Sequence, residues 1–521
     1  SSGTSFSEEM SGMLLDNTML ELQTDLNVSG LQFSGISSLL NTNGNTLNIS
    51  SGLDIGGGPE FDFTNVTTDN ESELSLVGDA SITKTGDLVL SHINAKGYTL
   101  TLNPNITSLT AKHIWLTNNW DNSSTNYMAN SGKLVAQGVD VTLRKQIYLN
   151  NGTIEMGGGT LTLEQGGYLQ EEGVLDLSNS ILELSGPFYN YQGKGTLTTS
   201  ASTLRLKSNV KFEPGNNAAF DTYEPNGWGM VLNNNSQDSS EAINLTLGTN
   251  GEDLILDPTL SPNSESLMSG FVNSYQDGEE FDTNSYGIGI ESYGVGLTIN
   301  GDLILRNDAL LKTYGEDISI ANLNLESGLV EVKNTGGNLS IAGGSIGANG
   351  ELKVGGQATL NLAGDLTVAG KLNLHPHSNF NLAGNTLDAS GGRLEIGGER
   401  SFDSITTNGN TTLQVNSYLE LSRTDSGSST IGNLELIMLE GDEINSLNIS
   451  NMSLVVGGIA ALAGKQITLN SGTLSFQGTP ALSNMSSLNV SGGELILNSG
   501  GTFSDSSLNF TSSVFKPSGT I

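Results

Sequence analysis

The sequence predicts an all-β protein that folds as a parallel β-helix, or β-solenoid, of about 20 residues per coil with long loop insertions. The first observation is the strict alternation of aliphatic and polar residues over short segments, as in Glu351-Leu-Lys-Val, Lys371-Leu-Asn-Leu and Arg393-Leu-Glu-Ile. Alternation turns one face of a strand inward and the other toward water. The second observation is that equivalent segments recur about every 20 residues and end in Gly, Asn or Ala-Gly. Because one such strand cannot bury its apolar face alone, successive coils must stack.

The hand of the coil and the shortage of helix follow from the same spacing. Neighbouring segments lie about 6 to 8 residues apart, and this drift favours a right-handed β-helix. Left-handed hexapeptide helices keep a stricter period of about six residues, with a small aliphatic residue at a fixed position. No part of the chain shows a sustained 3.6-residue period, so we expect very little helix.

Composition excludes several classes of partner. The chain has 521 residues and a formal net charge of −35, although only 14% of its residues are charged. This charge argues against nucleic acid, whose phosphates require Lys and Arg, and against anionic membranes. No apolar run approaches the about 18 residues of a spanning helix, so we expect no membrane insertion. The chain starts at Ser1 without an apolar leader and has no cysteine, from which we expect a processed, exported protein.

The rhythm of the strands divides the chain into five segments. Segments 31–206 and 296–500 are dense in alternating strands and are expected to form the β-solenoid. Segment 207–295 breaks the rhythm with four of the ten prolines, so we expect coils with long aromatic and acidic loop insertions there. Segment 1–30 is expected to be an N-terminal cap or assembly segment, and segment 501–521 a C-terminal strand or assembly segment.

Aromatic residues gather in and near the insertions. In exposed loops they could stack on sugar rings or bury at a contact with a partner protein. They could equally form a small satellite core beneath the loops. The candidate ligand-loop residues are Trp115, Trp120, Phe220, Tyr223, Trp228, Tyr275 and Tyr286.

Four acidic residues of the same segment form a candidate calcium site. Carboxylates and loop carbonyls are the oxygen ligands that Ca²⁺ prefers. The spacing does not match an EF-hand loop, and a solvated acidic loop is the alternative. No other cofactor is expected. The residues are Asp277, Glu279, Glu280 and Asp282.

We expect no enzymatic activity. Glycoside hydrolysis needs two carboxylates that face each other across a groove. The acids on the outward faces of the predicted strands, such as Glu155, Glu183 and Glu331, stand isolated among Ser, Thr and Asn. A polysaccharide lyase or hydrolase remains an alternative.

The two ends of the chain are candidate contact surfaces between copies. An exposed strand can add to the open sheet edge of another molecule. Head-to-tail addition that does not close produces a filament. The candidate interface residues are Leu508, Phe510, Val514 and Phe515 at one end and Met10, Leu14 and Leu15 at the other.

The run Asp365-Leu-Thr-Val-Ala-Gly-Lys-Leu-Asn-Leu resembles the coils of right-handed parallel β-helix surface proteins. These include filamentous-haemagglutinin-like adhesins and autotransporter passenger domains. The resemblance covers most of residues 31–206 and 296–500 and concerns the pattern of the coil. It implies an exported protein with an adhesive or structural role.

Together these observations predict an extracellular or cell-surface structural protein. The favoured version is a self-assembling subunit of a surface filament or sheath, with copies of itself as partners. One alternative is a monomeric adhesin passenger that binds glycan or surface proteins through the 207–295 loops. The other alternative is the polysaccharide-degrading enzyme.

Overall fold

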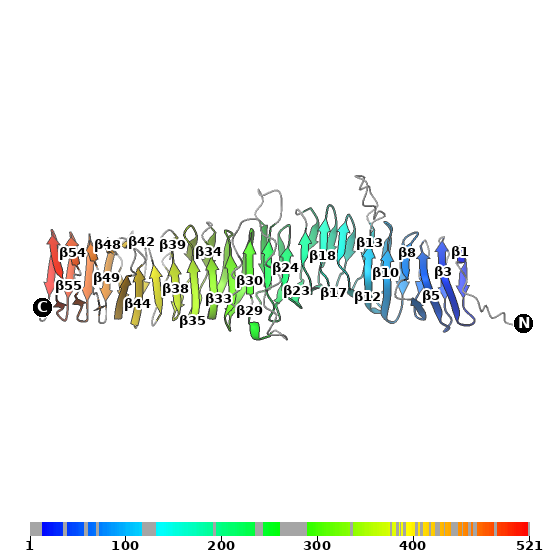
Figure 1. The fold of residues 1–521 in the computed structure, drawn as a ribbon, viewed down its shortest axis with the longest axis horizontal. Helices are drawn as coiled ribbons and strands as arrows, with labels where there is room; N and C mark the ends of the chain where they lie inside the picture. The colour runs from blue at the N-terminus through cyan, green and yellow to red at the C-terminus, as the bar shows by residue number, and fades with distance from the viewer. Residues whose placement is uncertain are drawn as a thin grey trace, which may run out of the picture. The chain divides into compact units, whose positions relative to one another are not determined.

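The structure, a computed structural model, confirms an all-β fold of parallel strands stacked in a β-solenoid of about 17 turns, with about 21 residues per turn. The described residues form two compact units, Ser1–Thr246 and Leu247–Ile521, and the boundary falls inside segment 207–295. Within each unit, strands from successive turns lie side by side (Figure 1). The structure describes residues 13–34, 39–56, 61–68, 72–116, 132–190, 194–234, 243–260, 289–333, 337–375, 378–381, 385, 387–388, 392–396, most of the strands between 398 and 461, 466–483 and 487–518.

Each coil of the first unit has three sides, and its strands form three large parallel sheets, the first of which spans two sides of the early coils. One coil runs through Asp140–Leu143, Ile147–Asn150 and Thr153–Glu155, and the next coil repeats all three strands in register. The first sheet contains β1 (Met13–Asp16), β3 (Leu26–Ser34), β5 (Leu47–Ile55), β7 (Val66–Thr68), β8 (Glu73–Leu76), β10 (Gly86–Asn94), β12 (Ile106–Trp115), β14 (Asp140–Leu143), β17 (Thr160–Leu163), β20 (Ile181–Leu184), β23 (Thr203–Leu206) and β26 (Thr222–Glu224). The second contains β6 (Phe61–Asp62), β9 (Ala80–Thr83), β11 (Thr99–Leu102), β13 (Lys133–Val135), β16 (Thr153–Glu155), β19 (Val174–Asp176) and β22 (Thr196–Thr198). The third contains β15 (Ile147–Asn150), β18 (Gly167–Gln170), β21 (Phe188–Asn190), β24 (Val210–Glu213), β25 (Ala218–Phe220) and β27 (Met230–Asn233), while β2 (Met19–Glu21) pairs with β4 (Leu39–Asn41).

The second unit repeats this three-sided coil, but several of its strands continue around a corner. The longest, β33 (Ile318–Val332), pairs along its length with four different strands and runs through all three sides of a coil. The other strands are β29 (Leu254–Leu256), β30 (Gly289–Tyr293), β31 (Val295–Leu305), β32 (Ala309–Thr313), β34 (Asn338–Ile341), β35 (Gly344–Val354), β36 (Thr359–Leu362), β37 (Leu366–Val368), β38 (Lys371–Leu374), β39 (Asn379–Asn381), β40 (Leu387–Asp388), β41 (Arg393–Ile396), β42 (Gly398–Ser401), β43 (Ile405–Thr406), β44 (Asn410–Val415), β45 (Tyr418–Ser422), β46 (Ser428–Ile431), β47 (Asn433–Met438), β48 (Ser446–Ser450), β49 (Met452–Val456), β50 (Ala460–Ala461), β51 (Gln466–Leu469), β52 (Gly472–Phe476), β53 (Ala481–Leu482), β54 (Ser487–Ser491), β55 (Glu494–Leu497), β56 (Thr502–Phe503), β57 (Ser507–Thr511) and β58 (Val514–Pro517).

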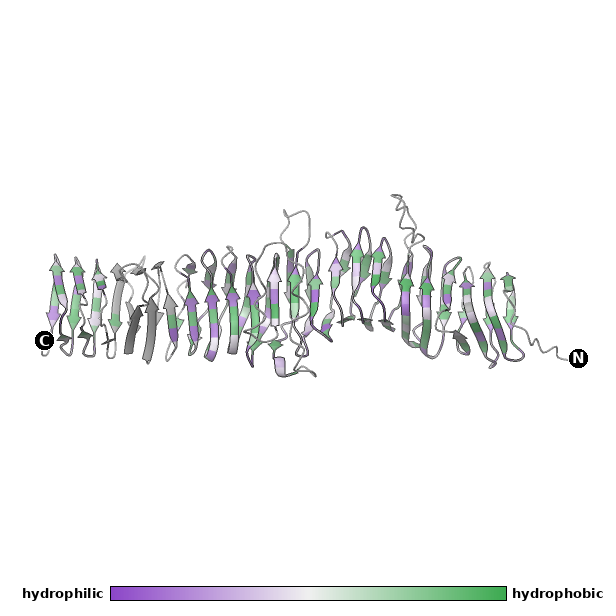
Figure 2. Cartoon of the chain, viewed as in Figure 1, coloured by the Kyte–Doolittle hydropathy of each residue, from purple (hydrophilic) through white to green (hydrophobic). Residues whose placement is uncertain are grey.

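The core of each unit lies inside the coil and is made of aliphatic columns. Alternate residues along many strands are buried, as in the pattern of β17 and β20, and the colour along the strands in Figure 2 changes between hydrophobic and hydrophilic residues. Leu161, Leu182 and Leu204 occupy the same position on successive coils and are fully buried. Their outward neighbours along each strand are polar, so the outer surface of the coil can face solvent. This arrangement explains why short Leu-polar-Leu segments suffice to specify the fold.

The corners of the coils are tied together by acidic side chains. The Asp140 carboxylate accepts a hydrogen bond from the backbone N–H of Thr160 at 2.7 Å, one coil further along. Asp79 does the same for Thr99 at 2.8 Å. The same bond recurs in the second unit, where Asp317 accepts from the N–H of Asn338 at 2.8 Å. A corner has no sheet ladder of its own, so these carboxylates satisfy N–H groups that the strands leave unpaired.

Helix is scarce in the part of the chain that the structure describes. A single 3-10 turn, η2 (Pro258–Leu260), is present there. No helix among the described residues has the length and apolar character needed to cross a membrane. This agrees with the missing 3.6-residue period in the sequence.

Candidate functional site

The outward faces of the coils carry side-chain columns, by which we mean residues at equivalent positions on successive coils. The first column is aromatic. Tyr148, Tyr168 and Tyr189 pair in register on β15, β18 and β21, and their rings stack at centroid distances of 5.0 and 4.9 Å. The Lys211 ammonium lies 5.2 Å from the Tyr189 centroid, within range of a cation–π contact. Tyr148 is 44% exposed, so the column reaches the surface.

This tyrosine column was missed in the sequence, although a signal was present. Tyr recurs there at the spacing of one coil, which places the rings in register once strands are aligned. Partial burial raises the pKa of Tyr168, and the neighbouring Tyr148 adds to the shift. The Tyr168 hydroxyl therefore stays protonated and neutral at physiological pH.

Trp115 also belongs to a coil, at the end of β12. Its ring stacks on His92 and on His113, each at a centroid distance of 5.5 Å, and the two imidazoles lie 5.4 Å apart. Burial lowers the pKa of His113, and the neighbouring His92 lowers it further. A neutral imidazole stacks more favourably at this position because two imidazolium ions would repel each other.

The remaining described aromatics from the predicted ligand loops are buried. Phe220 ends β25 and packs against Phe212 at a centroid distance of 6.3 Å, inside the core. Tyr223 on β26 and the nearby Trp228 are buried as well, and burial raises the pKa of Tyr223. These three side chains are buried within the first unit, and two of them, Phe220 and Tyr223, lie on strands of the coil. The residues that lie outside the described part of the chain are Met10, Trp120, Tyr275, Asp277, Glu279, Glu280, Asp282 and Tyr286.

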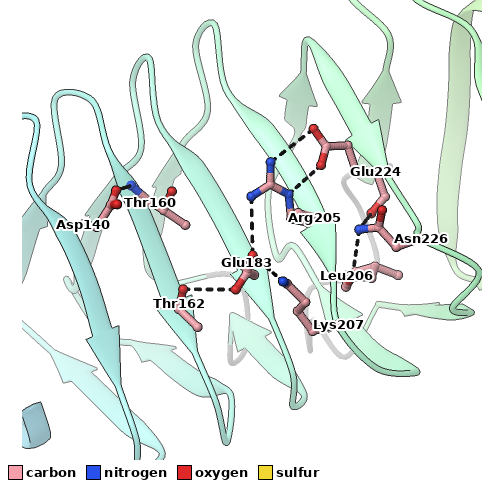
Figure 3. A network of polar contacts seen from close by, with 9 residues as sticks. All are labelled: Asp140, Thr160, Thr162, Glu183, Arg205, Leu206, Lys207, Glu224 and Asn226. Atoms are coloured by element: carbon pink, nitrogen blue, oxygen red, sulfur yellow. Dashed lines mark hydrogen bonds and ion pairs between the residues drawn. The ribbon is translucent and has the colours of Figure 1, made fainter. Parts of the chain in front are cut away.

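A second column in the first unit consists of ions. Glu183, Arg205 and Glu224 pair in register on β20, β23 and β26, so a guanidinium lies between two carboxylates (Figure 3). Arg205 donates from Nε to Glu224 Oε2 and from Nη1 to Glu183 Oε2, the second at 3.4 Å. Lys207 Nζ approaches the same Glu183 oxygen at 3.3 Å, and Thr162 Oγ1 donates to Glu183 Oε1 at 3.3 Å. The hydrogen bond to Glu224 raises the pKa of Arg205.

Other outward acidic residues named in the sequence analysis also contact a cation on a neighbouring coil. Lys133 Nζ lies 2.5 Å from Glu155 Oε1, on the next coil. Lys353 Nζ lies 2.8 Å from Glu331 Oε1 in the second unit. These carboxylates bridge coils through cations, which is a structural use of the charge.

The densest polar column lies in the second unit. Glu291, Lys312, Glu331 and Lys353 pair in register on β30, β32, β33 and β35, with alternating charge. The first three point away from the apolar core yet are only 6%, 5% and 4% exposed. Burial raises the pKa of Glu291, while a hydrogen bond from the Tyr293 hydroxyl at 2.9 Å opposes the shift.

The last described coil leaves its inward side chains incompletely covered. Leu508 and Phe510 on β57 continue columns whose previous members, Leu488 and Val490, are fully buried. Phe510 itself is 39% exposed. On β58, Phe515 continues the column of the buried Leu495 and is half-buried, its ring centroid 4.8 Å from that of Phe510. The structure therefore brings Phe510 and Phe515 of the predicted C-terminal residues together, whereas Val514 is 50% exposed.

The first described coil has the same character. Met13 and Leu15 on β1 point inward above the buried Leu31 and Phe33 and are half-buried. Leu14 points outward and is 64% exposed. Apolar side chains with this exposure are unusual for a surface.

The comparisons with known proteins leave the assignment at the level of the fold. Among the described residues, no group of three or more His, Cys, Asp or Glu side chains could hold a metal ion. No protein-family description, curated protein or solved structure matches this sequence. The chain is a parallel β-solenoid protein, and its function has to be argued from its surfaces.

Proposed function

We propose that this chain is an extracellular structural protein whose copies join end to end by stacking coil on coil, as a subunit of a surface filament or sheath. The observation that carries the proposal is the pair of uncovered apolar coils, β57 with β58 and β1 with β2. Burying a side chain such as Phe510 or Leu508 contributes about 1.5–3 kcal/mol. A coil laid on each of these surfaces would complete columns that are already buried one coil below.

The strand edges support the same proposal. Within the described residues, β58 pairs with β55 and β57 pairs with β54, so each has one further edge available. Such an edge accepts a strand from another molecule by ordinary backbone hydrogen bonds. Addition of one end to the other end does not close on itself, so it yields a filament.

The flanks of the coils favour a structural role over an enzymatic one. Carboxylates such as Glu183 and Glu331 contact Lys or Arg on neighbouring coils. A general acid and a base for glycoside hydrolysis would need to face a sugar between them. Incubation with a panel of acidic polysaccharides should release no reducing sugar or unsaturated uronate, and release would favour the lyase or hydrolase.

Electron microscopy of the unheated protein at neutral pH tests the proposal. We expect filaments from the unaltered chain and single particles from Phe510→Asp, because a carboxylate in the uncovered column cannot be buried. The matched control is Val89→Asp, which alters a side chain that is 65% exposed on β10. Filaments should persist in this control, and single particles from the unaltered chain would refute end-to-end assembly.

A second candidate function is a monomeric adhesin that binds glycan or protein. The observation that favours it is the tyrosine column, whose outer member Tyr148 is exposed. Aromatic rings at a surface pack well against sugars and against partner side chains. A glycan array probed with the unaltered chain and with Tyr148→Ala would detect such binding.

A further inference from the structure

Three polar side chains of the first unit converge on one buried carboxylate oxygen. Lys211 and Glu213 lie two residues apart on β24 and so share a face of the strand, while Asn233 ends β27. Lys211 Nζ lies 2.8 Å from Glu213 Oε1. Asn233 Nδ2 donates a hydrogen bond to the same oxygen at 2.9 Å. An amine and a carboxamide are therefore held next to each other across a single carboxylate.

The register of the strands explains why these groups meet. Tyr189 on β21 pairs with Glu213 from one side. The ladder between β24 and β27 brings Asn233 to the other side of Glu213. The ammonium of Lys211 lies 5.2 Å from the centroid of the Tyr189 ring. The long lysine side chain is thus directed by an aromatic ring and a carboxylate, which limits the positions that its amine can take.

The cluster is shielded from water although it lies on the outward face of the coil. The side chains of Lys211 and Glu213 are 14% and 2% exposed, and Asn233 is buried. Val231, which pairs with Lys211, is buried as well. Among the described residues, Glu213 Oε2 is buried without a hydrogen-bond partner. An ion pair in such a place is costly, because both charges lose their hydration.

These three groups are the ones that an amide bond between two side chains requires. A lysine amine is a nucleophile once it has lost a proton. A carboxylate within hydrogen-bond distance can take that proton and return it to the leaving group. Groups held side by side in a fixed geometry react far faster than free groups in solution.

We propose that Lys211 and Asn233 become joined by an isopeptide bond, with Glu213 as the general acid and base. Glu213 takes a proton from the ammonium, and the electron pair of Nζ attacks Cγ of Asn233. Glu213 returns this proton to Nδ2 as the Cγ–Nδ2 bond breaks and ammonia leaves. A second proton then passes from Nζ to Glu213. An ammonium, a carboxylate and a carboxamide thus become an amide, a neutral carboxyl group and ammonia, with no oxidant or reductant.

Burial favours this product. The reaction replaces a buried ion pair by two neutral groups, which removes the desolvation cost of the charges. The bond would fasten β24 to β27 covalently, and it does not depend on end-to-end assembly. The buried column of the second unit provides a contrast, because Lys312 there lies between Glu291 and Glu331 rather than beside a carboxamide.

Mass spectrometry of the denatured full chain tests the proposal. The unaltered chain should be lighter than its sequence by one ammonia. Chymotrypsin cuts after Phe212 and Trp228, between the two joined residues, and should release a branched peptide that links Lys211 to Asn233. Lys211→Arg should show the full mass, because the guanidinium stays protonated. The matched control is Lys207→Arg, which alters a half-exposed lysine and should keep the deficit.

The mass of the unaltered chain is decisive even where a variant does not fold. A full mass would overturn the proposal. A succinimide at an Asn-Gly pair such as Asn151-Gly152 also releases one ammonia, so a deficit that persists in Lys211→Arg would overturn it too.

A further variant tests the part played by the carboxylate. Glu213→Gln cannot accept the proton and should slow formation of the branched peptide at least about a hundredfold. Circular dichroism checks that this variant keeps its β-structure. An equal yield of branched peptide in the folded variant at the same time after synthesis would overturn the assignment of Glu213 as general acid and base.

Discussion

Both units contain a column of oppositely charged side chains on successive coils, but the two columns differ in how deeply they are buried. In the first unit, the column of Glu183, Arg205 and Glu224 lies at a partly exposed surface, and the tyrosine column reaches the solvent. In the second unit, the column of Glu291, Lys312 and Glu331 is almost fully buried. The register of the coils is the same in both. The difference shows that strand register determines which side chains contact each other. Burial determines how much each contact contributes to the free energy of unfolding.

The largest expected effect comes from removing a cation from the buried column. Lys312→Ala leaves the carboxylates of Glu291 and Glu331 buried without the cation between them, which should cost about 3–5 kcal/mol. The counterpart in the first unit, Lys207→Ala, removes a half-exposed partner of Glu183 and should cost less than about 1 kcal/mol. Urea unfolding followed by circular dichroism measures both, and equal losses would remove the distinction between the columns.

The apolar cores should not distinguish the units. Leu182→Ala in the first unit and Leu372→Ala in the second each delete a fully buried side chain from an aliphatic column. Each substitution should cost about 2–5 kcal/mol. Denaturant midpoints compare the two directly. A core substitution that is nearly neutral in one unit would show that its coils rearrange around the cavity.

The response to pH should have opposite signs at one residue in each unit. Burial raises the pKa of Glu291 above its ordinary 4.5, so the folded state holds this proton more tightly than the unfolded state does. Its contribution to stability is therefore complete below pH 4.5 and is lost as pH rises through the raised pKa. Hydrogen bonds from Thr107 and Ser108 lower the pKa of Asp87 below 3.8. Its contribution is present above pH 3.8 and is lost as pH falls through the lowered pKa.

Substitutions by uncharged residues separate the contributions of Glu291 and Asp87 to the pH dependence of stability. Glu291→Gln should flatten the decline of stability above pH 4.5, and Asp87→Asn should flatten the decline on the acid side. Denaturant unfolding at a series of pH values, with each variant compared to the unaltered chain, gives the two differences. Slopes of the same sign would contradict the assignment of burial as the dominant cause at Glu291.

The smallest expected effect is in the tyrosine column. Tyr168 stacks on a ring from each side, whereas Tyr148 lies at the exposed end of the three stacked rings. Tyr168→Ala should cost about 1 kcal/mol more than Tyr148→Ala, because each aromatic pair contributes about 0.5–1.5 kcal/mol beyond burial. Thermal unfolding of both variants measures the gap. Equal losses would mean that the stacked rings contribute through buried area alone.

The strands of a coil could be predicted from the sequence because the alternation of apolar and polar residues is a local signal. Lys371-Leu-Asn-Leu and Arg393-Leu-Glu-Ile coincide with β38 and β41, residue for residue. The approximate coil length also followed, since equivalent segments repeat at that distance. Both features depend on residues within one coil.

Features that depend on pairing between coils could not be read in the same way. Alternation fixes which face a residue occupies but permits a shift of two residues between neighbouring strands. The partners of Arg205 and Tyr168 therefore required the register itself. Prolines and aromatics in segment 207–295 indicated irregular loops, yet Phe220 and Tyr223 lie on short strands and point inward.

The corner bonds of Asp140 to Thr160 and of Asp79 to Thr99 have a consequence for how such a gene can change in length. Each bond joins positions one coil apart, so the smallest insertion that preserves every neighbour is a whole coil. Duplicating or deleting about 21 residues in frame would lengthen or shorten a unit by about 4.8 Å and leave its contacts intact. A single inserted residue within a strand would instead turn every following side chain of that strand to the wrong face. Recombination between repeats should therefore change the length of the chain in steps of one whole coil.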